Sequence, residues 1–328
     1  MIKIYDKLLT PLCVLTKATS IQWTKRFYDV GSFELHLTPN DANLKYIKEN
    51  HFISHNDNCG IILYLEQTPQ DVKICGYDLK GLLKIRKCEG AKTGNAETVI
   101  KSFVSENLIS ATDSKRNIPN FANAPNQNRG DTVDWVCEDL KLDVEINKIC
   151  LLSELGYDVK LINNEFVFDV IEGIDRTKNQ SAVPPVMFCK QFKNISDFEY
   201  IKDASTAVNT VYVGTTEIYD SVYTGLERRE GIEQSDGTED EIRTKGKAIL
   251  KEKAIKENIS AETNHRLKYK TDWNLGDYVT LKVDVFGETL LLDKQITEVE
   301  EIYERGNISI KPTFGEVKES IIKRLLKG

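Results

Sequence analysis

The chain has 328 residues, a formal net charge of −7 and a pI near 5.4. A single hydrophobic core is uncommon at this length, so we expect two or three compact units. Hydrophobic residues make up 40% and charged residues 29% of the chain, which is ordinary for a folded globular protein and argues against global disorder. The acidic balance argues against stable binding of nucleic acid, because such binding needs clustered lysine and arginine.

Seven cysteines are spread singly along the chain without a Cys-x-x-Cys pair. This spacing predicts neither a zinc site nor a disulfide framework, and it favours reduced thiols in a protein made in the cytoplasm. The first residues carry charges instead of an apolar core, and no run of about 18 apolar residues follows, so we expect neither a signal peptide nor a membrane anchor. No glycine-rich phosphate loop occurs, and no cofactor is predicted.

The first 90 residues follow a two-residue period that is typical of strands. Residues 23–37 predict a β-hairpin, since Phe33, Leu35 and Leu37 alternate with polar residues and residues 29–31 supply the turn. The pattern therefore predicts a β-unit.

A second predicted strand pair follows in the same unit. Residues 51–54 and the alternating stretch 61–65 are separated by an Asn-Asp-Asn turn at 56–58. One interruption, residues 40–50, places Leu44 and Ile47 three apart and predicts a short capped helix.

Residues 91–187 change character and predict an inserted α/β unit. Two sets of apolar residues recur at helical spacing, with Asp131 as the N-cap of the second set: Val99, Ile100, Phe103 and Val104, then Val133, Val136, Cys137 and Leu140. Residues 117–129 are predicted to form the loop between these two helices.

The same unit closes with a predicted hairpin. A third apolar stretch at 149–155 ends at Gly156, and strands at 157–162 and 165–171 follow, joined by an Asn-Asn turn.

Strand-type patterning returns after residues 184–185. The clearest strand, residues 279–285, alternates apolar and polar side chains and leads through a turn at 286–288 into a second strand. Residues 235–237 are expected to open a long charged helix that runs to about residue 258 and lies on the second β-unit. Residues 316–327 predict an amphipathic helix that packs on the domain or on another subunit.

Several segments carry a family resemblance in the same order along nearly the whole chain. They are residues 23–37, residues 76–83 followed by Arg86, residues 173–177 followed by 184–188, residues 275–279, and residues 296–299 running to 314–315. Together they resemble the tail-hub proteins of siphoviruses and phage-tail-like particles, also called baseplate hub or tail-associated proteins.

The resemblance implies an α+β, mainly β fold with two hub-type β-barrels. The first barrel would comprise residues 1–90 and be completed by about 188–205, with residues 91–187 as the inserted α/β domain. The second barrel would comprise residues 206–315, with a helical insert at about 236–260, and be followed by a C-terminal helix at 316–328.

The resemblance also implies a structural, non-enzymatic role at the virion tail tip. In that role a homotrimer forms a ring that adapts the six-fold tail tube to a three-fold tip and ends the DNA-ejection channel. The implied partners are the distal tail protein ring or tail tube, the tape-measure protein, and a separate tip spike or receptor-binding protein. The alternative is a tail-tip cell-wall hydrolase or a carbohydrate-binding module.

Three constellations of polar residues favour structural interpretations. His51, His55 and Cys59 lie in or beside a strand, where four residues span about 13 Å, too far for one metal ion. The acidic run at 236–241 lacks the spacing of a calcium loop and suits the first turn of a helix. Four glutamates could supply a glycosidase pair, but no accompanying signature supports catalysis: Glu298, Glu300, Glu301 and Glu304.

The three tryptophans divide between core and interface. Trp135 is assigned to the apolar face of the second predicted helix and hence to the core. Trp23, with Arg26 nearby, and Trp273 are weaker candidates for a subunit interface, where tryptophan and arginine are enriched.

Overall fold

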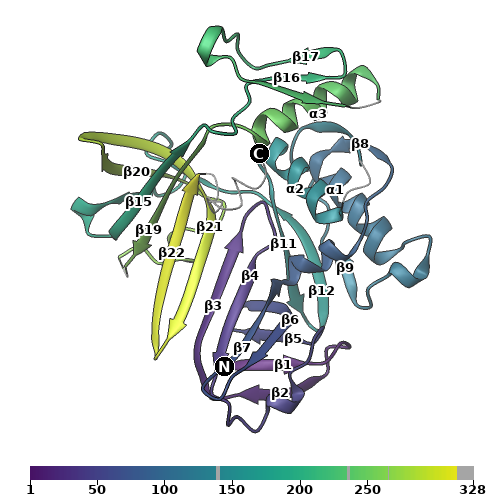
Figure 1. Cartoon of the computed structure of the whole chain (residues 1–328), viewed down its shortest axis with the longest axis vertical. Coiled ribbons are helices and arrows are strands. Elements are labelled where there is room, and N and C mark those ends of the chain that lie inside the picture. The colour runs from purple at the N-terminus through teal and green to yellow at the C-terminus, as the bar shows by residue number, and fades with distance from the viewer. Residues whose placement is uncertain (138–140, 235–236, 265, 316–328) are drawn as a thin grey trace.

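The computed structural model describes residues 1–137, 141–234, 237–264 and 266–315, and has the predicted α+β, mainly β fold (Figure 1). The described chain divides into four parts. The N-terminal β-unit comprises residues 1–85, the insert domain residues 91–171, the C-terminal β-unit residues 173–203 and 256–315, and the α3 module residues 207–254. The predicted helix at 316–328 lies outside the described residues.

The N-terminal β-unit consists of strands and short 3-10 turns: β1 (Ile2–Tyr5), β2 (Pro11–Leu15), β3 (Ala18–Arg26), β4 (Ser32–Leu37), η1 (Leu44–Tyr46), β5 (Phe52–His55), β6 (Asn58–Gln67), β7 (Val72–Asp78) and η2 (Leu79–Ile85). The predicted hairpin is confirmed as β3 and β4, and the predicted second pair as β5 and β6. The helix expected at 40–50 is wrong. Only the single turn η1 forms, because so few residues give too few hydrogen bonds to offset helix nucleation.

The insert domain contains both helices and strands: β8 (Ala91–Asn95), α1 (Ala96–Val104), the π-turn η3 (Ser105–Ile109), η4 (Ser114–Arg116), β9 (Phe121–Asn123), β10 (Thr132–Val136), α2 (Leu142–Ser153), β11 (Gly156–Ile162) and β12 (Glu165–Ile171). Helix α1 and the β11–β12 hairpin are confirmed. The loop predicted at 117–129 also contains β9, which pairs parallel to β12.

The second predicted helix of the insert domain is wrong. Residues 132–136 form β10, in which Val133 and Trp135 alternate inward and pair with β8. Three of the five residues of β10 are apolar, a pattern that fits a strand as well as a helix, and the valines and Trp135 favour the strand. Asp131 is no N-cap, since its carbonyl accepts from the Ala96 amide, while Leu140 lies outside the described residues.

Helix α2 lies further along the chain and contains residues 149–153 of the third apolar stretch, which was predicted at 149–155. It ends at Ser153, with Glu154 in the left-handed region at φ 57°. Gly156, predicted to end this stretch, is instead the first residue of β11.

The C-terminal β-unit is built from β13 (Asp175–Arg176), β14 (Met187–Cys189), η5 (Lys190–Phe192), β15 (Ile195–Asp203), β19 (Lys256–Thr263), β20 (Tyr278–Val285), β21 (Glu288–Glu304) and β22 (Asn307–Gly315). The predicted β20–β21 hairpin is confirmed. Residues 188–205 were expected to complete the first barrel, which is wrong. In the structure β14 pairs with β20, and β15 pairs with β19, because their apolar residues fill the core of the C-terminal β-unit.

The α3 module comprises β16 (Thr210–Val213), β17 (Thr216–Ile218), η6 (Gly225–Glu227), β18 (Glu230–Glu233) and α3 (Glu239–Glu252). Thr238 is the N-cap of α3 and forms a capping box with Glu241, so the acidic run starts a helix as predicted, although residues 235–236 lie outside the described part. The helix ends six residues before the predicted end. Residues 256–263 form β19, whose Ile259 and Ala261 alternate into the core of the C-terminal β-unit.

Helix α3 packs on β16 and β17, which lie in the range predicted for the second barrel, and also on the insert domain. Ala248 joins the core of the insert domain, and Lys251 Nζ donates to the Leu152 carbonyl at 3.2 Å and pairs with Glu154 at 2.8 Å. Helices α1, α2 and α3 therefore gather on one side of the molecule (Figure 1).

The two β-units share one sheet. Its strands run in the order β15-β19-β22-β21-β3-β4-β7-β6-β5-β1-β2, and β20 pairs with β21 outside this path. The join is the antiparallel pair β3–β21, which runs from Arg26 opposite Glu298 to Ser20 opposite Glu304. The prediction of two separate barrels is therefore corrected: across the described residues the strand order is open, with no closed barrel, and the two β-units meet edge to edge.

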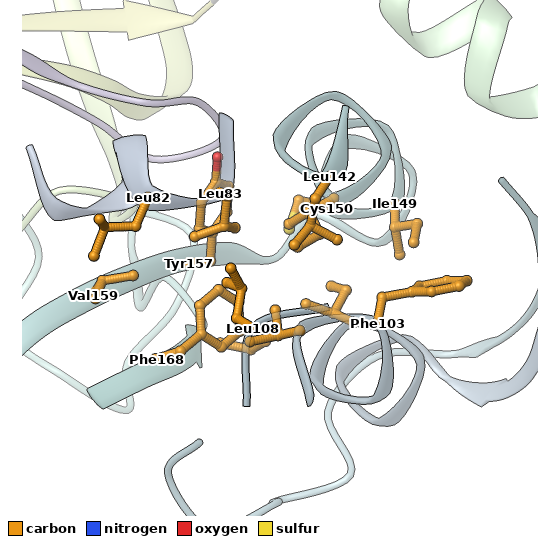
Figure 2. Packing of buried hydrophobic residues seen from close by; sticks show 14 of the residues in the cluster. Leu82, Leu83, Phe103, Leu108, Leu142, Ile149, Cys150, Tyr157, Val159 and Phe168 are labelled. Atoms are coloured by element: carbon orange, nitrogen blue, oxygen red, sulfur yellow. The ribbon is translucent and has the colours of Figure 1, made fainter. Parts of the chain in front are cut away.

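Each β-unit keeps its own core, and the largest core belongs to the insert domain. Figure 2 shows Leu82 and Leu83 of η2 beside Tyr157 and Val159 of β11, with Leu142 and Cys150 of α2 close by. Because η2 extends the N-terminal β-unit into this core, the insert domain and that unit are expected to unfold together.

Candidate assembly site

The turn between β3 and β4 is the point where three parts of the molecule meet. Phe27 is fully buried there. Its amide donates to the Thr297 carbonyl of the C-terminal β-unit at 2.9 Å, and its carbonyl accepts from the Tyr157 amide of the insert domain at 3.3 Å. We call residues 26–31 and the groups that contact them the three-unit junction.

Two glycines allow the Phe27 ring to lie at the junction. A Cβ on Gly156 would lie 2.5 Å from the Phe27 ring, and one on Gly276 would lie 2.2 Å from it. Gly276 also has φ +96°, which side-chain-bearing residues rarely adopt. The ring is therefore clamped between backbone of the insert domain and backbone of the C-terminal β-unit.

Residues of the C-terminal β-unit and of the insert domain form hydrogen bonds with Tyr28 of the same turn. Tyr28 Oη donates to Gln295 Oε1 at 2.5 Å, and Asn147 Nδ2 of α2 donates to the Tyr28 carbonyl at 2.9 Å. Burial raises the pKa of Tyr28, so its hydroxyl stays protonated and remains a donor.

A buried charged pair, Lys80 and Asp78, forms hydrogen bonds with the backbone of the same turn. Lys80 is 2% exposed, and its Nζ donates to the carbonyls of Arg26 and Asp29 and lies 4.9 Å from the centre of the Tyr157 ring. Asp78 accepts from the Gly31 amide at 3.1 Å and lies 3.9 Å from the Lys80 ammonium.

Burial shifts the acid–base behaviour of this pair. Desolvation raises the pKa of Asp78 to about 6, and it lowers the pKa of Lys80. The Lys80 charge opposes the shift of Asp78, as expected for a cation near a carboxylate.

The predicted interface residues divide between core and surface. Trp23 is 1% exposed and its ring centre lies 4.9 Å from that of Phe33, while Trp273 is fully buried and packs edge-on against Phe188. Both tryptophans lie in the core of this chain, so their side chains offer no surface to another subunit. Arg26 pairs with Glu298 at 2.7 Å across the β3–β21 join and keeps about a third of its side chain exposed. Its contact with a neighbouring subunit stays a prediction.

The glutamates of β21 hold the β-units together. Glu298 pairs with Arg26, and Glu300 accepts from Gln22 Nε2. Glu301 is 1% exposed, accepts from Asn58 Nδ2 at 3.2 Å and pairs with Lys270 at 3.2 Å. These carboxylates are thus engaged in contacts within the chain, and Glu304 ends the strand.

The two histidines considered for a metal site, His51 and His55, make separate contacts with other residues. His51 Nδ1 contacts the Tyr46 carbonyl at 3.0 Å, whereas the His55 ring packs edge-on against Tyr303. Burial raises the pKa of the Cys59 thiol to about 12, which keeps it protonated. Within the described ranges no group of three or more His, Cys, Asp or Glu side chains could hold a metal ion.

A cleft of about 1030 Å³, lined by polar and apolar side chains, opens where the three parts meet. Its walls come from β1 and β6, from β11 and β12, and from the segment before β20, and they include Lys25, Asp57, Asp158 and Lys270. Lys270 pairs with Asp57 at 3.5 Å, so side chains of opposite charge lie together in the cleft.

Large apolar side chains are also exposed at the tip of one hairpin and in one loop. Phe286 is 94% exposed at the tip of the β20–β21 hairpin. The loop between β17 and η6 exposes Tyr219, Val222 and Tyr223, and Leu226 of η6 is fully exposed. No role was predicted from the sequence for this loop, for Phe27 or for Lys80, although four apolar residues among polar and charged ones at 219–227 distinguish the loop. In the part of the chain that the structure describes, no helix is long and apolar enough to cross a membrane.

Three solved structures share this fold over nearly their full length. The 43 kDa tail protein of prophage MuSo2 from Shewanella oneidensis has a TM-score of 0.58 and 10% identity, covering 95% of each chain. Prophage tail protein gp18 from Listeria monocytogenes EGD-e has a TM-score of 0.56 and 14% identity, covering 100% of this chain and 99% of that one. The tail protein from Neisseria meningitidis MC58 has a TM-score of 0.57 and 12% identity, covering 96% of each.

No curated protein matches the chain. The family model described as Siphovirus ReqiPepy6 Gp37-like protein matches residues 1–220 and 226–316, which is most of the sequence. This agrees with the resemblance to phage tail proteins found from the sequence segments. The chain therefore belongs to the Siphovirus ReqiPepy6 Gp37-like family of phage tail proteins.

Proposed function

We propose that this tail protein is the hub of the tail tip, a homotrimeric ring that adapts a six-fold tail tube to a three-fold tip. The observation that carries the proposal is the β3–β21 join, which gives each chain two β-units in one continuous sheet. Three copies around a symmetry axis would present six such units, which suits a partner with six-fold symmetry.

The three-unit junction supports a rigid adaptor. A ring that transmits one symmetry to another needs its units at fixed relative positions. Phe27, Lys80 and the two glycines fix these positions through buried contacts rather than through a linker. The proposed role is structural, with no catalytic step.

The proposed partners follow from this position. The ring would contact the distal tail protein or tail tube on one side and a separate tip spike or receptor-binding protein on the other. It would surround the end of the tape-measure protein and line the last part of the DNA-ejection channel. An acidic chain suits such a channel, because it does not retain polyanionic DNA.

The location is tested by electron microscopy of particles from the producing strain with gold-labelled antibody against this chain. Label confined to the end of the tail supports the hub, and label along the tube or on tailless particles contradicts it. Chemical crosslinking within assembled tails should give trimers of this chain. Dimers or hexamers without trimers would contradict the three-fold ring.

The structural role is tested separately with purified chain and peptidoglycan. We expect no release of soluble fragments. Turnover would contradict the non-enzymatic role and favour the alternative of a cell-wall hydrolase.

A further inference from the structure

The fold brings two cysteines, Cys88 and Cys137, together at the start of the insert domain. Strands β8 and β10 pair with Val136 opposite Ala91, and the Cys137 amide extends this pairing by donating to the Gly90 carbonyl at 2.9 Å. In an antiparallel pair, a residue two positions from the direct partner is a diagonal neighbour. Cys88 is two positions before Gly90, so the register places it close to Cys137.

The side chains of the two cysteines contact each other at the core of the insert domain. Both are free thiols, and Cys88 is fully buried in this core while Cys137 packs against it. A hydrogen bond with the Cys88 side chain is the main cause that raises the pKa of the Cys137 thiol, and burial adds to the rise. Cysteines whose side chains lie close and point toward each other have the geometry that a disulfide needs.

A cavity gives a small reagent access to one of these cysteines. It has a volume of about 340 Å³ and lies between β10, α2 and α3, where Cys137, Lys148 and Ile249 are among its lining residues. Cys137 is partly exposed, whereas Cys88 is fully buried. A reagent in the cavity therefore meets Cys137 first, and the Cys88 thiol is the neighbouring group that can complete a disulfide.

We propose that Cys88 and Cys137 form a reversible disulfide bond when the folded chain meets a low-molecular-weight disulfide. The Cys137 thiolate attacks one sulfur of the reagent and breaks its S–S bond, and the released small thiolate takes up the proton that Cys137 lost. The Cys88 thiolate then attacks the Cys137 sulfur, and a second small thiol leaves with the proton from Cys88. The two protein thiols thus lose two electrons, and the reagent is reduced to two thiols.

The bond would strengthen a part of the insert domain that has little support from a sheet. Strands β8 and β10 form a sheet of two strands, which is marginally stable by itself. A Cys88–Cys137 bond closes the chain that contains α1 and β9 into a loop and so restricts the unfolded state. Thiols stay reduced in the cytoplasm and oxidise outside it, so the bond would form in a tail after its release. The inference does not depend on the proposed function.

Oxidation of the full chain with hydroxyethyl disulfide tests the bond. Mass spectrometry of the native chain should show the loss of two hydrogen atoms and, after digestion without reductant, one linked pair of peptides that contains Cys88 and Cys137. The rate should rise with pH, because the thiolate is the attacking species. The oxidised chain should unfold at a higher urea concentration than the reduced chain, and a reducing thiol should abolish the difference. Chain unfolded in urea is the control and should give a mixture of pairings.

Serine variants test the order of attack. In Cys88→Ser the reagent should stay on Cys137 as a mixed disulfide, and in Cys137→Ser its yield on Cys88 should be about tenfold lower, because Cys88 is fully buried. The control Cys13→Ser should form the same linked peptides as the original chain.

The results that would overturn the proposal are equally specific. They are the absence of the Cys88–Cys137 peptide pair from the native chain, a bond from either residue to another cysteine or to a second copy, and a mixed disulfide that persists on Cys137 while Cys88 is present. The unsubstituted native chain decides the question if a variant does not fold.

Discussion

The contact between Phe27 and Gly156 allows a sharp test of the three-unit junction. The substitution Gly156→Ala places a methyl group where the Phe27 ring lies, 2.5 Å from two of its carbons and 2.8 Å from a third. Gly156 has no left-handed backbone, so the substitution acts by steric overlap alone.

The magnitude follows from the rigidity of the site. The ring cannot move away easily, because the backbone of Gly276 packs against it as well. A Cβ built on Gly276 would lie 2.2 Å from the Phe27 ring. Overpacking of a rigid core costs about 1–3 kcal/mol. Phe27→Leu removes ring atoms that the methyl would touch, and we expect it alone to cost about 1–3 kcal/mol, less than a truncation to alanine.

The double variant carries the decisive information. The smaller leucine side chain in place of Phe27 makes room for the alanine methyl. The double variant should therefore lose about 1 kcal/mol less of its free energy of unfolding than the two single variants lose together. Urea unfolding of the three variants measures this coupling. The control Gly237→Ala places its methyl group 2.9 Å from Glu241 Oε2, the end of a side chain that can move, and should lower the free energy of unfolding less than Gly156→Ala does. Strict additivity, or a negligible effect of Gly156→Ala, would refute the packing described for Phe27.

Further predictions concern the buried pair and the α3 helix. Lys80→Met leaves buried carbonyls and Asp78 without their cation and should cost about 3–5 kcal/mol, whereas Lys3→Met on the surface should cost little; urea unfolding compares them. The carboxyl ¹³C resonance of Asp78 should titrate near pH 6. Because this pKa lies above its unfolded value of about 3.9, the contribution of Asp78 to stability is fully present below pH 4 and is lost as pH rises through about 6. A midpoint near 4 would contradict the burial. Thr238→Ala removes a capping box and should cost about 1 kcal/mol, visible as faster amide exchange in the first turn of α3, and Thr238→Ser should preserve it.

Local patterns in the sequence were enough to predict the hairpins. In β4 the alternation of Phe33, Leu35 and Leu37 with polar residues sets which face is buried, and the structure buries all three. The α1 helix was equally predictable, because Val99 and Ile100 are followed four residues later by Phe103 and Val104, the spacing of one helical face. These features depend on residues close in sequence.

Contacts between distant residues could not be predicted in this way. The β3–β21 pair joins residues more than 270 positions apart, and nothing in either strand specifies its partner. The two barrels were implied by the family resemblance and not by the strand patterns, and the open strand order corrects that implication. The burial of Lys80 could not be predicted from its neighbours in sequence, because it depends on carbonyls of the turn between β3 and β4.

The segments that carried the family resemblance converge on the three-unit junction. The turn at 26–31 is held by Asp78 and Lys80 from the second segment. Arg176 from the third segment pairs with Asp277 of the fourth at 2.9 Å, and Gly173 lies so close to Gly276 that a Cβ would meet its carbonyl at 1.8 Å. A junction built from buried charges and backbone contacts tolerates few side chains. We therefore expect substitutions of these residues to destabilise the junction. If the chain is the proposed adaptor, the residues of the three-unit junction hold its two β-units in the fixed relative position that the adaptor requires.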